Sequence, residues 1–392
     1  MSTALVIGAG PAGLMAADVL SENGHDVTVC DAMPSFGRKF LMAGKSGLNL
    51  TKDEPLDRFI ARFGVLHPTL ETALRDFGPI EVMAWAEDLG QSIFTGSTGR
   101  VFPTAMKASP LLRAWLARLR TANVSFNARW KWTGFENQSS EFSTPNGAQT
   151  INADVTVLAM GGASWARLGT TGEWAAQFDA TAPFKPANMG FDVTWSDHMT
   201  RFFGEPVKAT ALHAGRKTTR GEWVITANGI EGGGVYDISS VVRDGATLHI
   251  DLFPDISATD LRARVKKRRS KQTFSQFLKK TVRLSPLKTA LLYEFTRDHD
   301  LNDSDVLIAC LKSLPVAING PMHTDGAIST AGGLRLSALD AQFMLKDRPG
   351  VFAAGEMLDW EAPTGGYLIN GCLATGMAAG QGATRWLSQA HQ

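Results

Sequence analysis

Three glycines near the start of the chain have the spacing of a dinucleotide-binding loop. Gly8, Gly10 and Gly13 form the pattern G-x-G-x-x-G directly after a short apolar run at residues 4–7. In such a loop the first glycine permits a tight turn, the second lets the backbone approach a pyrophosphate, and the third lets the next helix pack on the strand. The pattern predicts a dinucleotide site, and the alternative is a glycine-rich turn that binds nothing.

The sequence around this loop has the order strand, helix, strand. The helix predicted over residues 11–22 begins with Pro11 and Ala12, so its free N–H groups and positive dipole end would face the phosphates. A second strand over residues 26–30 delivers Asp31, eighteen residues after the last glycine of the loop. A carboxylate near this position accepts hydrogen bonds from the adenosine ribose in dinucleotide-binding folds. The context therefore favours a dinucleotide site over a simple turn.

A glycine-punctuated loop with three cations follows at residues 37–51. We expect Arg38 and Lys39 to be charge partners of the phosphates, and the backbone N–H groups from Gly44 to Gly47 to donate to phosphate oxygens. The alternative is a solvated surface loop.

Two later segments each have a buried strand that ends at residues suited to contact a ligand. A buried strand over residues 154–160 ends at Gly161 and Gly162, as a chain does where it passes close to a ligand. A second buried strand over residues 351–354 leads into Gly355 and Glu356, whose carboxylate would face a polyol.

The final helix is predicted to begin near residues 366–370, and its N-terminus would offer backbone donors to an electron-rich ring edge. The alternative is a helix that merely closes the sheet. The layout fits FAD, with the pyrophosphate at the first helix, the ribityl chain at the strand-end acid and the ring at the last helix. The residues expected to contact FAD are Gly8, Gly10, Pro11, Ala12, Gly13, Asp31, Ala32, Arg38, Lys39, Gly44, Gly47, Asn49, Ala159, Gly161, Gly162, Gly355, Glu356, Gly365, Gly366, Tyr367, Leu368 and Asn370.

Composition limits the possible environments. The 392 residues include 39 basic and 38 acidic side chains, so the net charge of +1 gives no overall field for nucleic acid or an anionic membrane. No apolar run is long enough to span a bilayer, and the N-terminal segment lacks the basic residues of a secretion signal. Three cysteines without a C-x-x-C pair predict buried thiols in a reducing cytoplasm. We expect no metal site.

One segment departs from this charge balance. Residues 257–313 have a helical pattern and contain a cluster of basic side chains. We interpret the cluster as a solvated helical face, and the alternative is the binding site of an anionic partner such as RNA. The basic residues are Arg262, Arg264, Lys266, Lys267, Arg268, Arg269, Lys271, Lys279, Lys280, Arg283 and Lys288.

The combination of motifs resembles the bacterial aminoacetone-oxidase-like FAD-binding family, which includes a reductase of bile-acid dehydroxylation. The motifs are V-I-G-A-G-P-A-G-L, G-R-K-F-L-M-A-G-K-S-G-L-N-L-T, L-A-M-G-G-A-S-W, A-I-S-T-A-G-G and F-A-A-G-E-M-L-D-W-E-A-P-T-G-G-Y-L-I-N-G-C. Where other members have a loop like S-G-G-G-R-C-N, this chain has A-G-K-S-G-L-N at residues 43–49, so roles of that arginine and cysteine do not transfer. Asp31 stands where many relatives have glutamate.

The resemblance implies an α/β fold with a discontinuous, glutathione-reductase-like Rossmann domain for FAD. A β-barrel and a small helical insert would interrupt it, which agrees with changes of sequence texture near residues 185, 254 and 315. A glycine run at residues 228–236 lacks a strand-helix-strand context, so we do not expect a second nucleotide site there. The expected segments are 1–184 and 336–392 for FAD, 185–253 for the barrel, 254–315 for the helices and 316–335 for the return strands of the barrel.

The leading hypothesis is an FAD-dependent oxidoreductase that moves a hydride between the flavin and a small organic substrate, with NAD(P)H as a possible transient donor. We expect Tyr367, Asn370, Trp360 and Glu361 near the ring and His323 as a candidate for proton transfer. The alternatives are an RNA-directed flavoprotein that uses the basic helices and a flavin-binding protein without turnover.

Overall fold

The protein divides into two units in its computed structural model, which describes residues 1–44, 47–268 and 271–390. Unit 1 comprises Met1–Lys185 and Ser329–Gln392, and unit 2 comprises Pro186–Ile328. Both ends of the chain therefore belong to unit 1. The segment expected to return to the barrel over residues 316–335 is divided between the units at residue 328.

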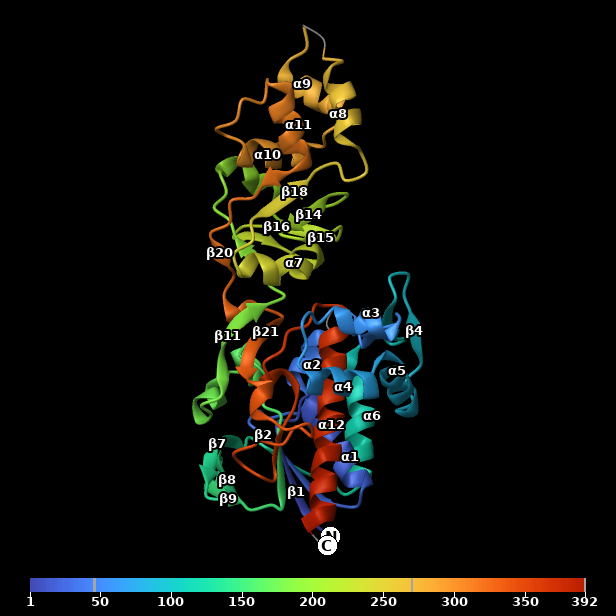
Figure 1. Ribbon diagram of the computed structural model, residues 1–392, viewed down its shortest axis with the longest axis vertical. Helices are drawn as coiled ribbons and strands as arrows, with labels where there is room; N and C mark the ends of the chain where they lie inside the picture. The colour runs from blue at the N-terminus through green and yellow to red at the C-terminus, as the bar shows by residue number, and fades with distance from the viewer. Residues whose placement is uncertain (45–46, 269–270, 391–392) are drawn as a thin grey trace. The chain divides into compact units, whose positions relative to one another are not determined.

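Five parallel strands form the central sheet of unit 1, in the order β22-β10-β1-β2-β6. Figure 1 labels β1 and β2 of this sheet. All four residues of β10 and the last four of β1 are buried, as expected for parallel strands that are covered on both faces. The carboxyl ends of parallel strands share one edge, so the loops after β1, β2, β10 and β22 converge there. The strands are β1 Thr3–Ile7, β2 Asp26–Asp31, β6 Ser125–Ala128, β10 Val155–Leu158 and β22 Val351–Ala353.

One strand of this sheet was not expected. Alternating residues near 124–126, 130–135 and 141–144 predict one antiparallel meander, but β6 pairs parallel to β2, with Val29 opposite Phe126. The prediction was wrong because a short alternating segment does not reveal whether its partner precedes it by a hairpin or by a helical crossover. The meander itself is present as an antiparallel sheet of β7 Lys131–Glu136, β8 Ser139–Thr144 and β9 Gly147–Ile151.

Helix α1 Pro11–Glu22 and helix α12 Tyr367–Ala390 pack along each other (Figure 1). A Cβ atom on Gly376 would lie 2.3 Å from the carbonyl oxygen of Ala12, so this contact requires a residue without a side chain. No helix in the described part of the chain is long and apolar enough to cross a membrane. The remaining helices of unit 1 are α2 Arg38–Ala43, α3 Leu56–Ala61, α4 Pro68–Asp76, α5 Pro79–Asp88 and α6 Ala108–Thr121.

Two small sheets complete unit 1. β4 Ile93–Thr95 and β3 Thr51–Lys52 flank β5 Arg100–Pro103 in an antiparallel sheet. β11 Thr181–Ala187 and β21 Ser329–Leu334 form a two-stranded sheet at the passages between the units.

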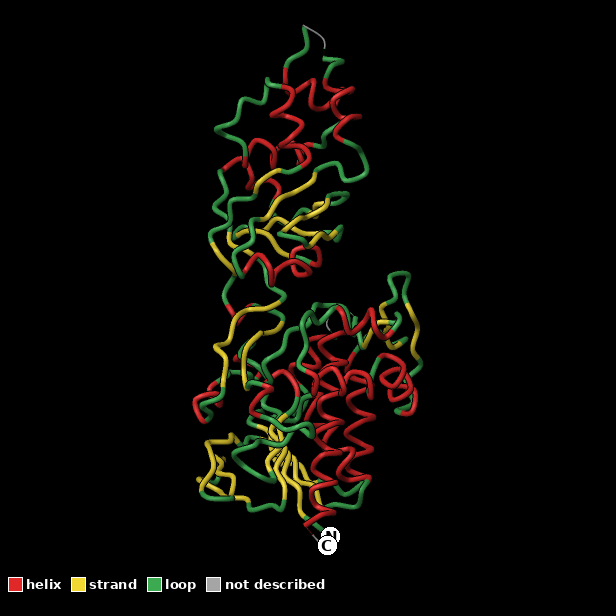
Figure 2. Tube along the Cα trace, viewed as in Figure 1, coloured by secondary structure: helices red, strands yellow, loops and turns green. Residues whose placement is uncertain are grey.

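The strands of unit 2 form two antiparallel sheets, where we expected a small barrel or a curled sheet (Figure 2). The first contains β13 Pro206–Val207, β16 Trp223–Thr226, β17 Gly229–Glu231, β12 Phe191–Asp192 and β20 Gly320–Pro321. The second contains β15 Lys217–Thr219, β14 Ala211–Ala214, β18 Leu248–Asp251 and β19 Leu314–Pro315. The helices are α7 Gly233–Arg243, α8 Ala258–Val265, α9 Phe274–Phe277, the π-helical turn η4 Leu278–Val282, α10 Pro286–Phe295 and α11 Ser304–Lys312. The fold class predicted from the sequence is confirmed: α/β with a parallel Rossmann-like sheet and additional antiparallel sheets.

The glycine run at residues 228–236 itself forms β17 and the start of α7, so a strand-helix order is present there, contrary to our expectation. β17 leads through Gly232 into α7, and β18 follows. However, β17 and β18 belong to different antiparallel sheets, so the segment is not a parallel βαβ unit. Close packing accounts for one of its glycines, because a Cβ on Gly234 would lie 2.4 Å from the carbonyl oxygen of Gly221.

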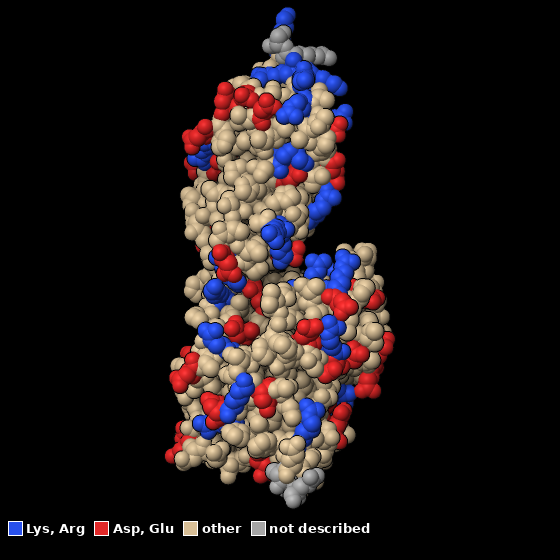
Figure 3. All heavy atoms as spheres, viewed as in Figure 1, with Lys and Arg blue, Asp and Glu red and all other residues tan. Residues whose placement is uncertain are grey.

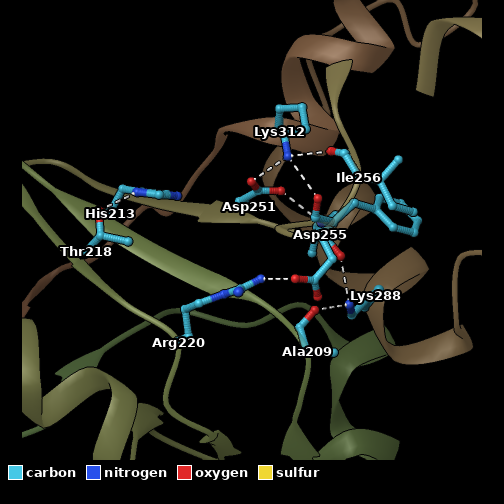
Figure 4. A network of polar contacts seen from close by, with 11 residues as sticks. Ala209, His213, Thr218, Arg220, Asp251, Asp255, Ile256, Lys288 and Lys312 are labelled. Carbon is cyan, nitrogen blue, oxygen red and sulfur yellow. Dashed lines mark hydrogen bonds and ion pairs between the residues drawn. The ribbon is translucent and has the colours of Figure 1, made fainter. Parts of the chain in front are cut away.

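Two half-buried lysines join α10 and α11 of unit 2 to β18 and to loops beside the strands (Figure 4). The ammonium group of Lys312 lies 2.7 Å from Oδ2 of Asp251 and donates to the carbonyl oxygens of Phe253 and Ile256. Lys288 donates to the carbonyl oxygens of Ala209 and Leu252, and burial lowers the pKa of Lys288. The partners of these two ammonium groups thus lie within unit 2.

We expect Lys312→Met to lower the free energy of unfolding of unit 2 by about 2–4 kcal/mol, because it leaves the Asp251 carboxylate buried without its cation. Lys208→Met is the matched control, since Lys208 and Glu222 pair with 68% and 51% of their side chains exposed. Its cost should be at most about 1 kcal/mol. Urea unfolding measures both, and equal losses would contradict the buried role of Lys312.

All three cysteines are buried and free. Burial raises the pKa of Cys30 to about 11 and that of Cys372 to about 12. The pKa of Cys310 is also raised by burial. These thiols are therefore neutral hydrophobic side chains near neutral pH, as the sequence indicated.

At pH 8 the native protein should not react with iodoacetamide at Cys30 or Cys372, whereas the urea-unfolded protein should react at both. Thiols of the unfolded chain ionise at about pH 8.5, whereas the buried thiols keep their protons to higher pH. The free energy of unfolding therefore falls as the pH rises from about 8.5 towards 11. The Cys30→Ala/Cys372→Ala variant should lose less stability over this range. An equal loss in both proteins would show that these thiols do not set the pH dependence.

Candidate functional site

The loop after β1 has open space at its middle glycine. A Cβ on Gly8, whose φ is +104°, would lie 2.2 Å from the carbonyl oxygen of Ala159, and one on Gly13 would lie 1.8 Å from the carbonyl oxygen of Gly8. These two glycines bring β1, β10 and α1 together. In contrast, apart from its neighbours in the chain, no atom of the described residues lies within 4 Å of a Cβ placed on Gly10. The backbone at Gly10 is therefore accessible to a ligand at the N-terminus of α1.

Asp31 fixes the same loop from the end of β2. Its Oδ2 accepts a hydrogen bond of 2.8 Å from the backbone N–H of Ala9, and its Oδ1 accepts one of 2.8 Å from Met33. Burial raises the pKa of Asp31, and these two N–H donors oppose that shift. Each carboxylate oxygen has a further lone pair, so the group that orders the loop can also accept a hydrogen bond from a ribose hydroxyl. Ala32 lies between Asp31 and Met33 in the sequence.

Three segments that are far apart in the sequence meet at Glu356. Nζ of Lys39 lies 2.6 Å from Oε2 of Glu356 and 2.8 Å from Oγ of Ser164, and the backbone N–H of Thr330 donates to Oε1 of Glu356 at 3.1 Å. Gly162 is enclosed by this group, because a Cβ there would lie 2.0 Å from Oγ1 of Thr330. The sequence placed Lys39, Gly162 and Glu356 at the cofactor separately, and the structure brings them together.

The loop after β2 contributes two buried polar atoms without a partner. Nε of Arg38 and Oδ1 of Asn49 have no hydrogen-bond partner among the described residues. Gly44 packs on Ala108, and Gly47 has a φ of +118°. Lys45 and Ser46, which the sequence also placed at the phosphates, lie outside the described residues. Unpaired buried donors and acceptors are costly, so a polar ligand would stabilise this loop.

The N-terminus of α12 is fixed against β3. A Cβ on Gly366 would lie 2.5 Å from Cα of Thr51. Asn370 is fully buried, accepts from Oγ1 of Thr51 at 2.6 Å and donates to the carbonyl oxygen of Phe77 at 2.9 Å. Gly365 has a positive φ of +113°, and Leu368 lies in the first turn of the helix. The first turn of α12 is thereby held in one position.

Tyr367 is buried in an aromatic cluster. Its hydroxyl donates to Oε1 of Glu54 at 2.5 Å, and its ring stacks on Phe59 with centroids 4.7 Å apart. Glu54 also lies near two cations, at 3.4 Å from Arg58 and 3.8 Å from Lys52. These contacts of Tyr367 and Asn370 hold α12 in place, and a role in the reaction stays a prediction for both.

The other residues predicted near the ring have different surroundings. Trp360 is buried and donates from Nε1 to the carbonyl oxygen of Gly355 at 2.8 Å. Glu361 lines a pocket of 280 Å³ together with His67 and Trp360. His323 belongs to unit 2, where its Nδ1 accepts from the backbone N–H of Asp325, and its proposed proton transfer stays a prediction.

Sequence reasoning did not select Ser164, Thr330, Thr51 or Glu54. Each makes a hydrogen bond with the side chain of a predicted residue. Ser164 and Thr330 lie inside two of the quoted motifs, two residues from a glycine pair, so their position was the available signal. Thr51 ends a third quoted motif with no glycine pair beside it, and Glu54 lies outside the motifs.

These residues fit FAD. The open backbone at Gly10, the unpaired polar atoms of Arg38 and Asn49, and the charged group at Glu356 lie on loops that share one edge of the parallel sheet. The free backbone N–H groups at the glycine-rich start of α12 would be available to a further part of such a ligand.

Comparison with known proteins decides the family. Residues 2–382 match the model described as the HI0933-like protein Rossmann domain. The chain belongs to this family. It is an FAD-binding oxidoreductase, so the cofactor and the enzyme class predicted from the sequence are confirmed.

Two curated relatives align with almost the whole chain. The chain is 26% identical to the 3-dehydro-bile acid delta(4,6)-reductase of Clostridium scindens, over 96% of this chain and 98% of the relative. It is 23% identical to the ribosomal RNA dihydrouridine synthase of Escherichia coli, over 96% of this chain and 97% of the relative. Among solved structures, it shares the fold of 3-ketosteroid-delta4-(5alpha)-dehydrogenase from Rhodococcus jostii RHA1, with a TM-score of 0.52, 16% identity, and coverage of 98% and 96% of the two chains.

We expect Gly10→Val to fold and to bind FAD at least about tenfold more weakly, because its side chain would occupy the open space at the pyrophosphate. Gly326→Val is the matched control, since no atom lies within 4 Å of its Cβ and it belongs to unit 2. Equilibrium titration of the apoproteins with FAD measures both affinities. Unchanged affinity in Gly10→Val would place the pyrophosphate elsewhere.

Proposed function

We propose that the protein reduces a carbon–carbon double bond that is conjugated to a carbonyl group. The observation that carries this proposal is the full-length alignment with a relative named as a delta(4,6)-reductase of a 3-dehydro-bile acid. In a steroid with a 3-keto group, double bonds at positions 4 and 6 are conjugated to that carbonyl. The carbon β to the carbonyl is therefore electron-poor and accepts a hydride.

The second relative supports the same reaction on a different molecule. Dihydrouridine is uridine with hydrogen added across the C5–C6 double bond, which is conjugated to the C4 carbonyl. The names of the two relatives thus describe reductions of one functional group. The shared feature is the conjugated double bond and not the size of the substrate.

In this proposal the chain holds FAD through both of its ends. Gly10 and the N-terminus of α1 bind the pyrophosphate, Asp31 binds the ribose, and Glu356 binds the ribityl hydroxyls. Bound FAD supplies the hydride when reduced. The N-terminus of α12 stabilises negative charge at the ring edge.

Several polar residues hold other residues of the site in place. Lys39 and Thr330 orient the Glu356 carboxylate. Glu54 and Thr51 hold Tyr367 and Asn370, so these two predicted catalytic residues keep the start of α12 in place. NAD(P)H binds transiently as the electron donor, because a reductase needs a source of hydride. The reducing cytoplasm suits three buried free thiols.

The first candidate substrate is a small conjugated ketone. The second candidate is a uracil base in RNA, and two observations favour considering it: the relative that is a ribosomal RNA dihydrouridine synthase, and the basic helices of unit 2. Both candidates use the same chemistry at the flavin.

The test is anaerobic reoxidation of the reduced enzyme. FAD-loaded protein, reduced with NADPH or dithionite, is mixed with a 3-keto-Δ4,6 steroid or with uridine-containing RNA, and the oxidised flavin absorbance is followed by stopped flow. We expect the unsaturated substrate to restore the oxidised spectrum and the saturated analogue to leave it unchanged. Reoxidation by oxygen alone, with no response to either substrate, would refute the proposed reaction.

A further inference from the structure

One segment of unit 2 carries a large excess of positive charge. Residues 261–283 contain ten basic residues and no acidic residue, in a chain with a net charge of only +1. The described part of this segment comprises the end of α8, all of α9 and the turn η4, while Arg269 lies outside the described residues. The excess is therefore local.

The apolar side chains of these elements point inward and the basic ones outward. Leu261 and Val265 of α8 are buried, as are Phe277, Leu278 and Val282 of α9 and η4. α8 also contacts η4, so both elements belong to one part of the unit. Figure 3 shows lysine and arginine atoms gathered over α8 and α9 on the face in view. The exposed basic residues are Arg262, Lys266, Lys267, Arg268, Lys271, Lys279, Lys280 and Arg283, which we call the basic surface.

Most lysines of the basic surface have no acidic partner in the part of the chain that the structure describes, whereas other cations of unit 2 are bound by oxygen atoms of the protein. Figure 4 shows Lys288, Lys312 and Arg220 bound to carbonyl oxygens and aspartates, so their charge is used inside the molecule. Arg262 pairs with Asp305. No ion pair with an acidic side chain is found among the described residues for the lysines at 266, 267, 279 and 280. Their charge is available to an anionic partner.

Aromatic rings lie beside these charges. The guanidinium group of Arg268 lies over the rings of Phe274 and Phe277, at 5.2 and 5.3 Å from their centroids. The ring of Tyr293 meets Phe274 edge to face at 6.4 Å, and Tyr293 is 41% exposed. An exposed ring next to cations is the combination that binds unstacked bases as well as phosphates.

We propose that the basic surface and Tyr293 bind RNA. The proposal deepens the proposed function and rests on it, because it assigns RNA as the molecule that presents the conjugated ring. In this proposal the basic helices are a binding surface rather than the solvated helical face that their sequence pattern favours. A membrane fits less well, since Tyr293 is the one exposed large hydrophobic residue between 258 and 295 in the described part of the chain.

The test measures RNA affinity of FAD-loaded, full-length variants by fluorescence anisotropy. The probes are a labelled fragment of ribosomal RNA and labelled poly(U), each titrated at several salt concentrations. Lys279→Glu/Lys280→Glu should bind both at least about tenfold more weakly, and the slope of log Kd against log salt should fall by about 1.5–2. Tyr293→Ala should bind poly(U) about fivefold more weakly or worse.

The matched control is Arg113→Glu/Arg216→Glu, which reverses two exposed charges outside the basic surface and should change affinity less than twofold. Equal weakening in both double variants, or wild-type binding to phosphatidylglycerol vesicles without binding to RNA, would overturn the proposal. Steroid-driven flavin reoxidation is measured on the same preparations. Any steroid-driven reoxidation should be equal in the wild type and the basic-surface variant. The proposed reaction itself is refuted only if neither the steroid nor uridine-containing RNA reoxidises the flavin of any preparation.

Discussion

The close approach of three backbones at the end of β1 is the constraint on which unit 1 depends. β1, β10 and α1 meet where any side chain on Gly8 or Gly13 would overlap a carbonyl group. Gly376 extends the same kind of contact to α12, so the last helix lies directly on the first. Because these contacts join residues from both ends of the chain, the cofactor site forms only when the N-terminal and C-terminal segments have folded together.

The partners of a charged side chain in this protein depend on whether the side chain is buried or exposed. In unit 1, Lys39 and Glu356 are joined at the predicted ribityl position, where isolated charges would be costly to bury. In unit 2, Lys288 and Lys312 are bound to backbone oxygens, and the basic surface carries its cations in solvent. The number of lysines and arginines in a segment does not show which of them are bound within the fold. For this reason we predicted Lys288 to be part of the exposed basic cluster.

The candidate cofactor loops could be located from the sequence because each is marked by a short motif. The glycines at 8, 10 and 13 follow one strand directly, and Asp31 ends the next strand, although the contacts that these residues make reach Ala159 and Ala9. The parallel pairing of β6 and the division of unit 2 into two sheets depend on long-range contacts, and short alternating strands do not encode them. The same holds for side chains that support others: Thr51 reaches Asn370 across 319 residues, and no pattern in the sequence announces that bond.

The central claim is that both ends of the chain bind one FAD molecule. Hydrogen–deuterium exchange of the full-length apoprotein with and without FAD tests it most directly, since it reports on backbone N–H groups at each proposed contact. We expect FAD binding to slow exchange in peptides that cover residues 8–14 and, to a similar extent, in those that cover 354–358 and 365–371. Protection confined to the N-terminal peptide would contradict it.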